Sequence, residues 1–262
     1  MAEASKLKDR VLLLMHTPFG INENYLYNFY ILKYEQALLS IINQYSSIIL
    51  VCLSGHRHED SFRVYSSSEA TLGILSHPSI SPIGYLSLPS IRRYRYNRVS
   101  IQLTDYDQYT LNLLESERTG RESWSLSYTF TSWYYQSREI TSNSLRQLTY
   151  RVRTESSYLK RFLLAKYYSV NTTLTRHKII QVVCAMTLFN FDEFILCTRL
   201  LEKKHLELYS EMIMNYLTQL NPHSAEQSNE YRHVYRRIAV FLFVVSITIG
   251  ALIYRIFTIY LL

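Results

Sequence analysis

Two short apolar runs, each followed by a histidine, constrain the fold of this chain most. Residues 48–53 read Ile-Ile-Leu-Val-Cys-Leu, a continuous and partly β-branched run bordered by serine and glycine, which predicts a buried strand. Residues 11–15 form a second run of this kind, and His16 follows it directly. Open α/β sheets bind their ligands beyond the carboxyl ends of the strands. The sequence therefore predicts an α/β fold with histidines at this edge of a sheet.

A Gly-His-x-His sequence at residues 55–58 follows the first of these runs. Gly55 lets the backbone turn sharply, and we expect the two histidines of an extended turn here to point to opposite sides of it. His56 and His58 are therefore better placed to bind two adjacent metal ions than one. On these residues alone, two partly exposed loop histidines without a ligand are the simpler alternative.

The rest of the sequence predicts helices and antiparallel strands around this sheet. Apolar residues spaced three and four apart predict a helix over residues 22–45, and short alternating runs over 62–113 predict strands that continue the sheet. A charged loop or boundary is expected at 114–122. The pattern over 142–168 is helical, and a helix pair is expected across 179–200.

The basic character of the chain raises the question of a nucleic-acid partner. The formal net charge is +7, and residues 92–98 interleave arginine with tyrosine, a pattern that can contact phosphates and stack on bases. Alternation along a strand would instead place these arginines on the solvent side and pack the tyrosines inward. A solvated basic face explains the segment, so no nucleic acid is expected as a partner.

The order of these elements resembles the acid sphingomyelinase and acid sphingomyelinase-like phosphodiesterases of the metallophosphoesterase superfamily. Their His-x-Pro-Pro-Gly turn is matched at residues 16–20, with Phe19 in place of one proline. Their Gly-His-x-His-x-Asp-x-Phe-x-Val motif is matched at residues 55–64. Further similarity lies at residues 79–82, 88–96 and 103–113, with Leu88 in place of the asparagine that is usual in the family.

The resemblance implies an α/β fold that forms the carboxyl half of a metallophosphoesterase β-sandwich flanked by helices. A helical subdomain and a C-terminal transmembrane segment are expected to follow it. The expected divisions are a partial metallophosphoesterase domain at 1–115, the helical subdomain at 116–205, a linker at 206–235, and a transmembrane helix or lipid-anchor signal at 236–262.

The resemblance also implies a function, the two-metal hydrolysis of a phosphodiester such as sphingomyelin or a nucleotide. By resemblance, His16 and His56 ligate one zinc ion and His58 helps to ligate the other. The Asp-x-His, Gly-Asp and Gly-Asn-His-Glu segments of the family have no counterpart here, so four metal ligands and the general-acid histidine are missing. We therefore expect a truncated form with little activity alone, and whether the chain is an enzyme stays open. The alternative is a catalytically inactive, membrane-anchored binding or structural relative.

Two features bear on the compartment of the folded part. Cys184 and Cys197 lie thirteen positions apart, which allows a disulfide in an oxidising compartment, whereas two separate thiols would suit a reducing cytosol. By resemblance they correspond to paired cysteines in the terminal helical segment of the family. Asn171 begins a glycosylation sequon, which agrees with a luminal or extracellular location.

The end of the sequence predicts a membrane anchor over residues 238–262. Residues 238–254 carry no charge and would form about 26 Å of helix, and the apolar residues after Arg255 complete the length of a bilayer crossing. Arginines at 232, 236 and 237 would place the preceding domain in the cytosol as a tail-anchored protein. The sequon, the cysteine pair and the family resemblance favour the extracellular or lysosomal side.

Overall fold

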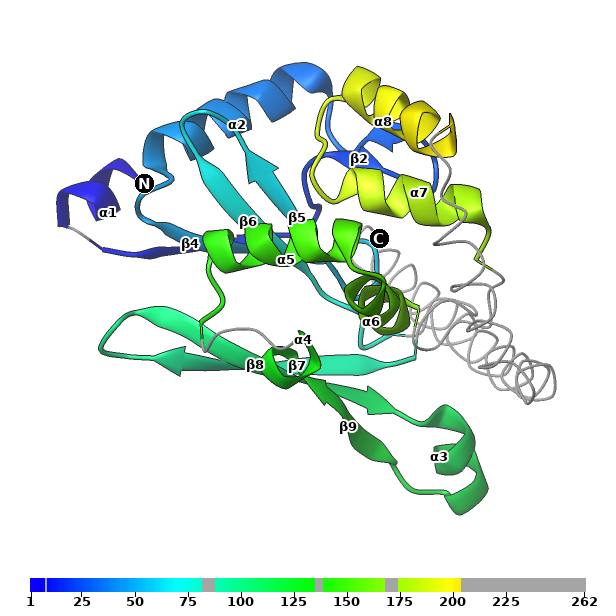
Figure 1. Ribbon diagram of the computed structural model, residues 1–262. Helices are drawn as coiled ribbons and strands as arrows, with labels where there is room; N and C mark the ends of the chain where they lie inside the picture. Colours follow the sequence, from blue (N-terminus) through cyan, green and yellow to red (C-terminus); the bar gives the residue numbers. More distant parts are fainter. Residues whose placement is uncertain (8, 82–87, 135–138, 168–173, 204–262) are drawn as a thin grey trace, which may run out of the picture.

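The computed structural model describes every residue except 8, 82–87, 135–138, 168–173 and 204–262. The described part has the mixed α/β fold that the sequence predicts, with a four-stranded sheet, a separate three-stranded sheet and helices around them (Figure 1). The predicted membrane segment at 236–262 and the sequon at Asn171 lie outside the described residues. Within the described ranges, no helix has the length and apolar character needed to cross a membrane.

The four-stranded sheet carries the two strands that the apolar runs predict. Its order is β1-β4-β6-β5, where β1, β4 and β6 are mutually parallel and β5 is antiparallel to β6. The carboxyl ends of the three parallel strands and the amino end of β5 therefore lie at one edge. Because β1 is the outermost strand, alternate side chains such as Leu14 are exposed. The bounds are β1 Val11–Met15, β4 Ile49–Ser54, β5 Ser61–Ser66 and β6 Thr71–Ser76.

Helix α2, Leu32–Tyr45, packs on one face of this sheet and begins ten residues later than predicted (Figure 1). The preceding residues form a hairpin of two short strands, β2 Ile21–Asn22 and β3 Tyr27–Asn28. The Asn22 side chain accepts a hydrogen bond from the backbone N–H of Asn24 at 3.1 Å. Asparagine favours such turns over helix, which explains why the apolar spacing alone predicted the wrong start.

Helices α5, Ser142–Thr154, and α6, Ser156–Lys166, cover the other face of the sheet (Figure 1). One helix was predicted over 142–168, but Glu155 adopts an extended conformation (φ −120°, ψ 117°) that separates two. Gly73 on β6 lets α5 approach closely, since a Cβ there would lie 2.5 Å from Leu145 Cδ1. Side chains from both helices and both sheets form the largest cluster of buried apolar residues.

The three-stranded sheet is separate, whereas the sequence predicted that its strands would continue the first sheet. Strands β7 Ser90–Asn97, β8 Gln102–Leu111 and β9 Trp124–Thr129 pair in antiparallel order. The segment predicted as a loop at 114–122 contains helix α3, Leu113–Thr119, which Asn112 caps and Gly120 (φ 66°) ends. Helix α4, Phe130–Tyr134, follows β9 and packs against β8.

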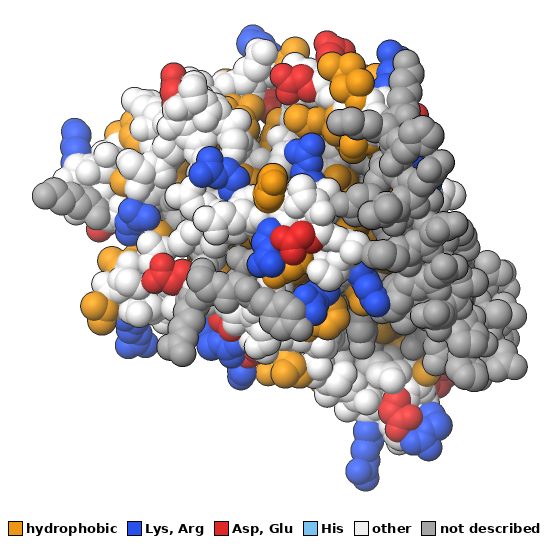
Figure 2. All heavy atoms as spheres, viewed as in Figure 1, with side chains coloured by type: hydrophobic (Ala, Val, Ile, Leu, Met, Phe, Trp, Pro, Cys, Tyr) orange, Lys and Arg blue, Asp and Glu red, His pale blue; other side chains and the backbone are white. Residues whose placement is uncertain are grey.

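The arginines of β7 do not all face solvent, and that expectation is wrong for Arg92. Side chains alternate along a strand, so Arg92 shares the inner face with Tyr94 and is almost fully buried. Arg93 and Arg95 lie on the outer face and pair with aspartates of β8, at 2.8 Å from Asp107 and 2.9 Å from Asp105 respectively. On the side of the molecule in Figure 2, lysine and arginine side chains are scattered among acidic and apolar ones.

Helices α7, Arg176–Ala185, and α8, Phe191–Lys203, form the pair predicted near the end of the described chain, and α1, Ala2–Leu7, lies at its start. A disulfide joins Cys184 on α7 to Cys197 on α8. Cys52 on β4 is a buried free thiol, as expected for a small apolar side chain in a core strand.

Replacing both disulfide cysteines by alanine is expected to lower the free energy of unfolding by about 3 kcal/mol, because closing a loop of this length restricts the unfolded chain. Urea denaturation of the wild type and of the double variant Cys184→Ala/Cys197→Ala, each with and without a reductant, would measure the effect. The reductant should bring the wild type to the stability of the variant and leave the variant unchanged. A wild type unaffected by reductant would show that the disulfide does not contribute.

Candidate functional site

The carboxyl edge of the four-stranded sheet brings His16 and His56 together. His16 follows β1 directly, and His56 follows β4 after Gly55, whose N–H donates a 2.9 Å hydrogen bond to the carbonyl of His16. Nε2 of His16 lies 3.2 Å from Nδ1 of His56, and both rings are exposed. Forty residues apart in sequence, the two imidazoles meet because β1 and β4 are parallel neighbours.

The separation of these two nitrogens fits a shared metal ion. Zinc binds imidazole nitrogen at about 2.0–2.1 Å with tetrahedral angles, so two ligands of one ion lie roughly 3.3 Å apart. The 3.2 Å between His16 Nε2 and His56 Nδ1 matches this distance. A structural zinc needs four ligands and a catalytic zinc three, and in the described ranges no group of three His, Cys, Asp or Glu side chains is placed to hold an ion. The pair therefore fits as two ligands of a larger set.

His58 is not part of this pair. His56 and His58 both have left-handed backbone conformations, with φ of 66° and 55°, so the turn is not the extended one that the sequence analysis assumed. Such conformations cost about 1–3 kcal/mol each in side chains other than glycine, and they concentrate at functional sites. The His58 ring is half-buried, and its Nδ1 is buried without a hydrogen-bond partner.

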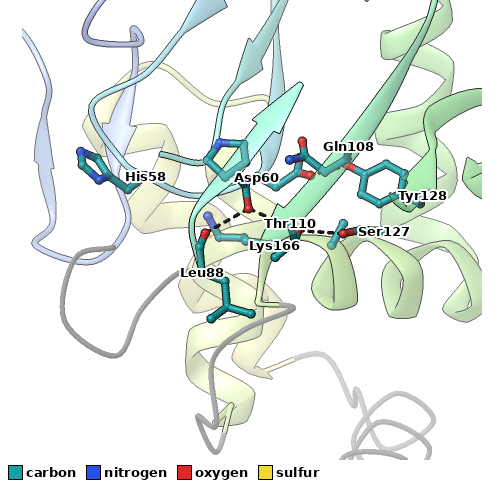
Figure 3. Close-up of a pocket in the computed structure, with 11 residues that line it drawn as sticks. His58, Asp60, Leu88, Gln108, Thr110, Ser127, Tyr128 and Lys166 are labelled. Carbon is teal, nitrogen blue, oxygen red and sulfur yellow. Dashed lines mark hydrogen bonds between the residues drawn. The ribbon is translucent and has the colours of Figure 1, made fainter. Parts of the chain in front are cut away.

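His58 lines a cavity of about 30 Å³ that separates the Gly-His-x-His turn from the three-stranded sheet (Figure 3). This volume suits one water molecule or a small ion. A row of hydroxyls forms one wall: Ser90 donates to the carbonyl of Leu88 at 3.0 Å, and Ser127 donates to Thr110 at 2.7 Å. The other lining residues are Asp60, Pro78, Gln108, Tyr128, Ala165 and Lys166.

A buried ionic cluster holds the residues on either side of His58. Arg57 lies 3.3 Å from Glu23 and 2.9 Å from Glu59, and Lys166 at the end of α6 contacts both carboxylates. Burial alone would raise the pKa of Glu23, but Lys166, Arg63 and Arg57 together lower it well below its ordinary value of 4.5. The strained turn is therefore fixed by charges from the β2–β3 hairpin and α6.

A second buried ion pair fixes the end of the turn. Oδ1 of Asp60 lies 2.7 Å from Nη2 of Arg92, and the Tyr128 hydroxyl donates to the other carboxylate oxygen. The Arg92 guanidinium also lies over the ring of Tyr106, 4.0 Å from its centre. Asp60 thus joins the first sheet to β7 and β9 of the second.

A fourth histidine, His77, lies at the same edge and was not predicted from the sequence. His77 follows β6, and its Nδ1 lies 2.9 Å from the carbonyl of Ser54, so Nδ1 donates and Nε2 accepts from the Tyr94 hydroxyl at 2.7 Å. Burial, then the charge of Arg92, lowers the pKa of His77 to about 4, so its ring is neutral at pH 7. The sequence signal for His77 was the same as for His16, an apolar strand followed by a histidine. Both ring nitrogens of His77 form hydrogen bonds that link the two sheets, so neither is free to bind a metal ion.

Comparison with known proteins identifies relatives of this chain. Residues 83–204 match the family described as acid sphingomyelin phosphodiesterase C-terminal region. Sphingomyelinase phosphodiesterase C of Dictyostelium discoideum is 30% identical over 177 residues, which cover 62% of this chain and 39% of that protein. Cyclic GMP-AMP phosphodiesterase SMPDL3A of Rattus norvegicus is 31% identical over 175 residues, covering 62% and 37%. Acid sphingomyelinase-like phosphodiesterase 3b of Homo sapiens is 24% identical over 209 residues, covering 75% and 46%.

The chain thus spans less than half the length of each of these relatives. The matched regions include residues that carry the resemblance in the sequence, and the relatives share one chemical description in their names, that of phosphodiesterases. We conclude that residues 83–204 belong to the family of acid sphingomyelin phosphodiesterase C-terminal regions, and that the chain is similar to acid sphingomyelinase-like phosphodiesterases over most of its length.

Proposed function

We propose that this chain carries part of the site of a phosphodiesterase in which His16 and His56 ligate a zinc ion. The observation that carries the proposal is the 3.2 Å separation of His16 Nε2 and His56 Nδ1 at the carboxyl edge of a parallel sheet. A bound zinc ion polarises a phosphoryl oxygen and lowers the pKa of a coordinated water. The names of the relatives support a phosphodiester as the substrate, with sphingolipids and nucleotides as the two candidate classes.

The proposal extends to a second zinc ion with His58 as one ligand. Its buried Nδ1 has no hydrogen-bond partner, and Arg57 and Glu59 hold the backbone on either side of it. A ligand that is fixed before the metal binds loses little conformational entropy on binding.

Further ligands must come from outside the described residues, since the described part places no third ligand beside the histidine pair. Because the Asp-x-His, Gly-Asp and Gly-Asn-His-Glu segments of the family have no counterpart in the sequence, we propose that the chain alone hydrolyses phosphodiesters weakly; zinc-dependent turnover by the purified 262-residue protein would contradict this. Membrane attachment through residues 238–262, on the extracellular or lysosomal side, completes the proposal. The alternative is an inactive, membrane-anchored binding module, in which the histidine pair serves no reaction.

Zinc titration tests the histidine pair directly. His16→Ala and His56→Ala are each expected to weaken zinc binding by at least about tenfold, since losing even an outer-shell partner of a ligand has that effect. His177→Ala is the matched control, because His177 is an exposed histidine on α7 that pairs with Glu202. Isothermal titration calorimetry of the four proteins gives the affinities. Equal zinc affinity in the wild type and His56→Ala would refute the proposed site.

A further inference from the structure

The segment that precedes and begins α2 exposes an unusual amount of apolar surface. Six large apolar side chains within ten consecutive residues are between 42% and 74% exposed. Scattered single apolar residues are normal on a protein surface, but a run of this density marks an interaction site. The residues of this segment, which we call the 25–34 surface, are Tyr25, Leu26, Tyr27, Ile31, Leu32 and Tyr34.

The backbone holds these side chains outward rather than leaving them loose. Leu26 occupies the hairpin turn with φ of 57°, a conformation that favours glycine or asparagine. Its N–H donates to the carbonyl of Asn22 at 2.8 Å, and the Tyr25 and Tyr27 rings stack with their centres 6.2 Å apart. The turn thus holds Leu26 in a backbone conformation that glycine or asparagine would adopt with less strain.

The charges of this region indicate what covers it. Residues 21–46 contain three charged side chains, and the two acidic ones, Glu23 and Glu35, are buried while Lys33 is exposed. Lys178 of α7 adds a second cation beside the hairpin through its contact with Asn24. Within residues 21–46 the surface therefore combines apolar and tyrosine side chains with positive charge and no exposed acid. This combination matches the headgroup region of a bilayer with anionic lipids.

The 25–34 surface leads directly to the histidine pair. Aromatic rings form a continuous series, with 6.5 Å between the centres of Tyr27 and Phe29, and 5.9 Å between Phe29 and His56. His56 in turn contacts His16. A bilayer in contact with Tyr25 and Leu26 would therefore bring lipid headgroups to the edge of the sheet that carries the histidines.

We propose that the 25–34 surface docks the histidine edge of the sheet onto a lipid bilayer. Its tyrosines lie at headgroup level, its aliphatic side chains enter the outer hydrocarbon layer, and Lys33 contacts lipid phosphate. This contact is distinct from any attachment through residues 238–262, because it sets the orientation of the folded domain on the membrane. Only its use in presenting a phosphodiester rests on the proposed function.

A fluorescent label at position 25 tests the docking in the full chain. Tyr25→Cys would be labelled with nitrobenzoxadiazole, since Cys52 is buried and the other two cysteines form a disulfide. Tyr150→Cys on α5, equally exposed in the free protein, is the matched control. On vesicles of phosphatidylcholine and phosphatidylserine, the label at 25 should shift to the blue and be quenched severalfold more by spin-labelled lipid than the label at 150.

The position of the label makes the test independent of anchoring by the C-terminal segment. If vesicle-bound protein carries a label at 25 that remains as water-exposed as the label at 150, the docking is refuted. A blue shift without vesicles that grows with protein concentration would show that a second copy covers the surface, which also overturns the proposal. Zinc titration of labelled Tyr25→Cys separates the two questions, since docking can fail while the histidine pair still binds zinc.

Discussion

Arg92→Met is expected to lower the free energy of unfolding by about 3–5 kcal/mol. The substitution removes the only charged partner that the described structure gives Asp60, and a buried ion left without its partner is destabilising by that amount. It also removes the contact of the guanidinium with the ring of Tyr106. Urea denaturation at pH 7, monitored by circular dichroism, measures the loss.

Arg93→Met is the matched control on the same strand. Arg93 is exposed, and its partner Asp107 keeps a second pairing with Arg95 at 2.8 Å. Exposed ion pairs contribute little, so the unfolding midpoint of this variant should stay close to that of the wild type. Equal losses in the two variants would contradict the buried role of Arg92.

Lys166→Met is expected to lower the free energy of unfolding by a similar amount, about 3–5 kcal/mol at pH 7. The methionine fills the space of the side chain but leaves Glu23 and Glu59 short of a positive charge, and Glu23 is almost fully buried. Lys160→Met, an exposed position on the same helix, controls for the change of residue type. The comparison uses the same denaturation experiment.

The loss in Lys166→Met should depend on pH in a defined direction. Because the folded protein lowers the pKa of Glu23 below 4.5, this carboxylate contributes stability above about pH 4.5, and the contribution is lost as the pH falls further. In Lys166→Met the pKa of Glu23 is lowered less, so acid removes less stability from the variant than from the wild type. The difference between the wild type and Lys166→Met should therefore shrink below about pH 4.5. A constant difference between pH 7 and pH 3 would show that the effect is one of packing.

The sequence predicted the histidines that follow strand ends, His16 and His56. The runs that end at Met15 and Leu53 are too short and too apolar for an exposed helix, so their histidines had to lie at a sheet edge. That both strands are parallel neighbours made the 3.2 Å approach of His16 and His56 possible, and the family resemblance pointed to the same pair.

The polar partners of the turn did not follow from the sequence. Lys166 is 107 residues from Glu59, and nothing in the helical pattern of α6 distinguishes it from a solvated lysine. Arg92 was assigned to the solvent face together with the other arginines of the run, although its register with Tyr94 already placed it inside. Such partners depend on which elements pack together, and local periodicity carries no information on that.

The position of β1 at the border of its sheet has a consequence for handling the protein. In the described structure one side of this strand pairs with β4, and its apolar side chains Leu12 and Leu14 are exposed. A bare, parallel, leucine-rich border is a template on which another polypeptide can add a strand. We therefore expect the purified protein to aggregate through this strand at high concentration, and we expect Leu14→Lys to reduce that aggregation.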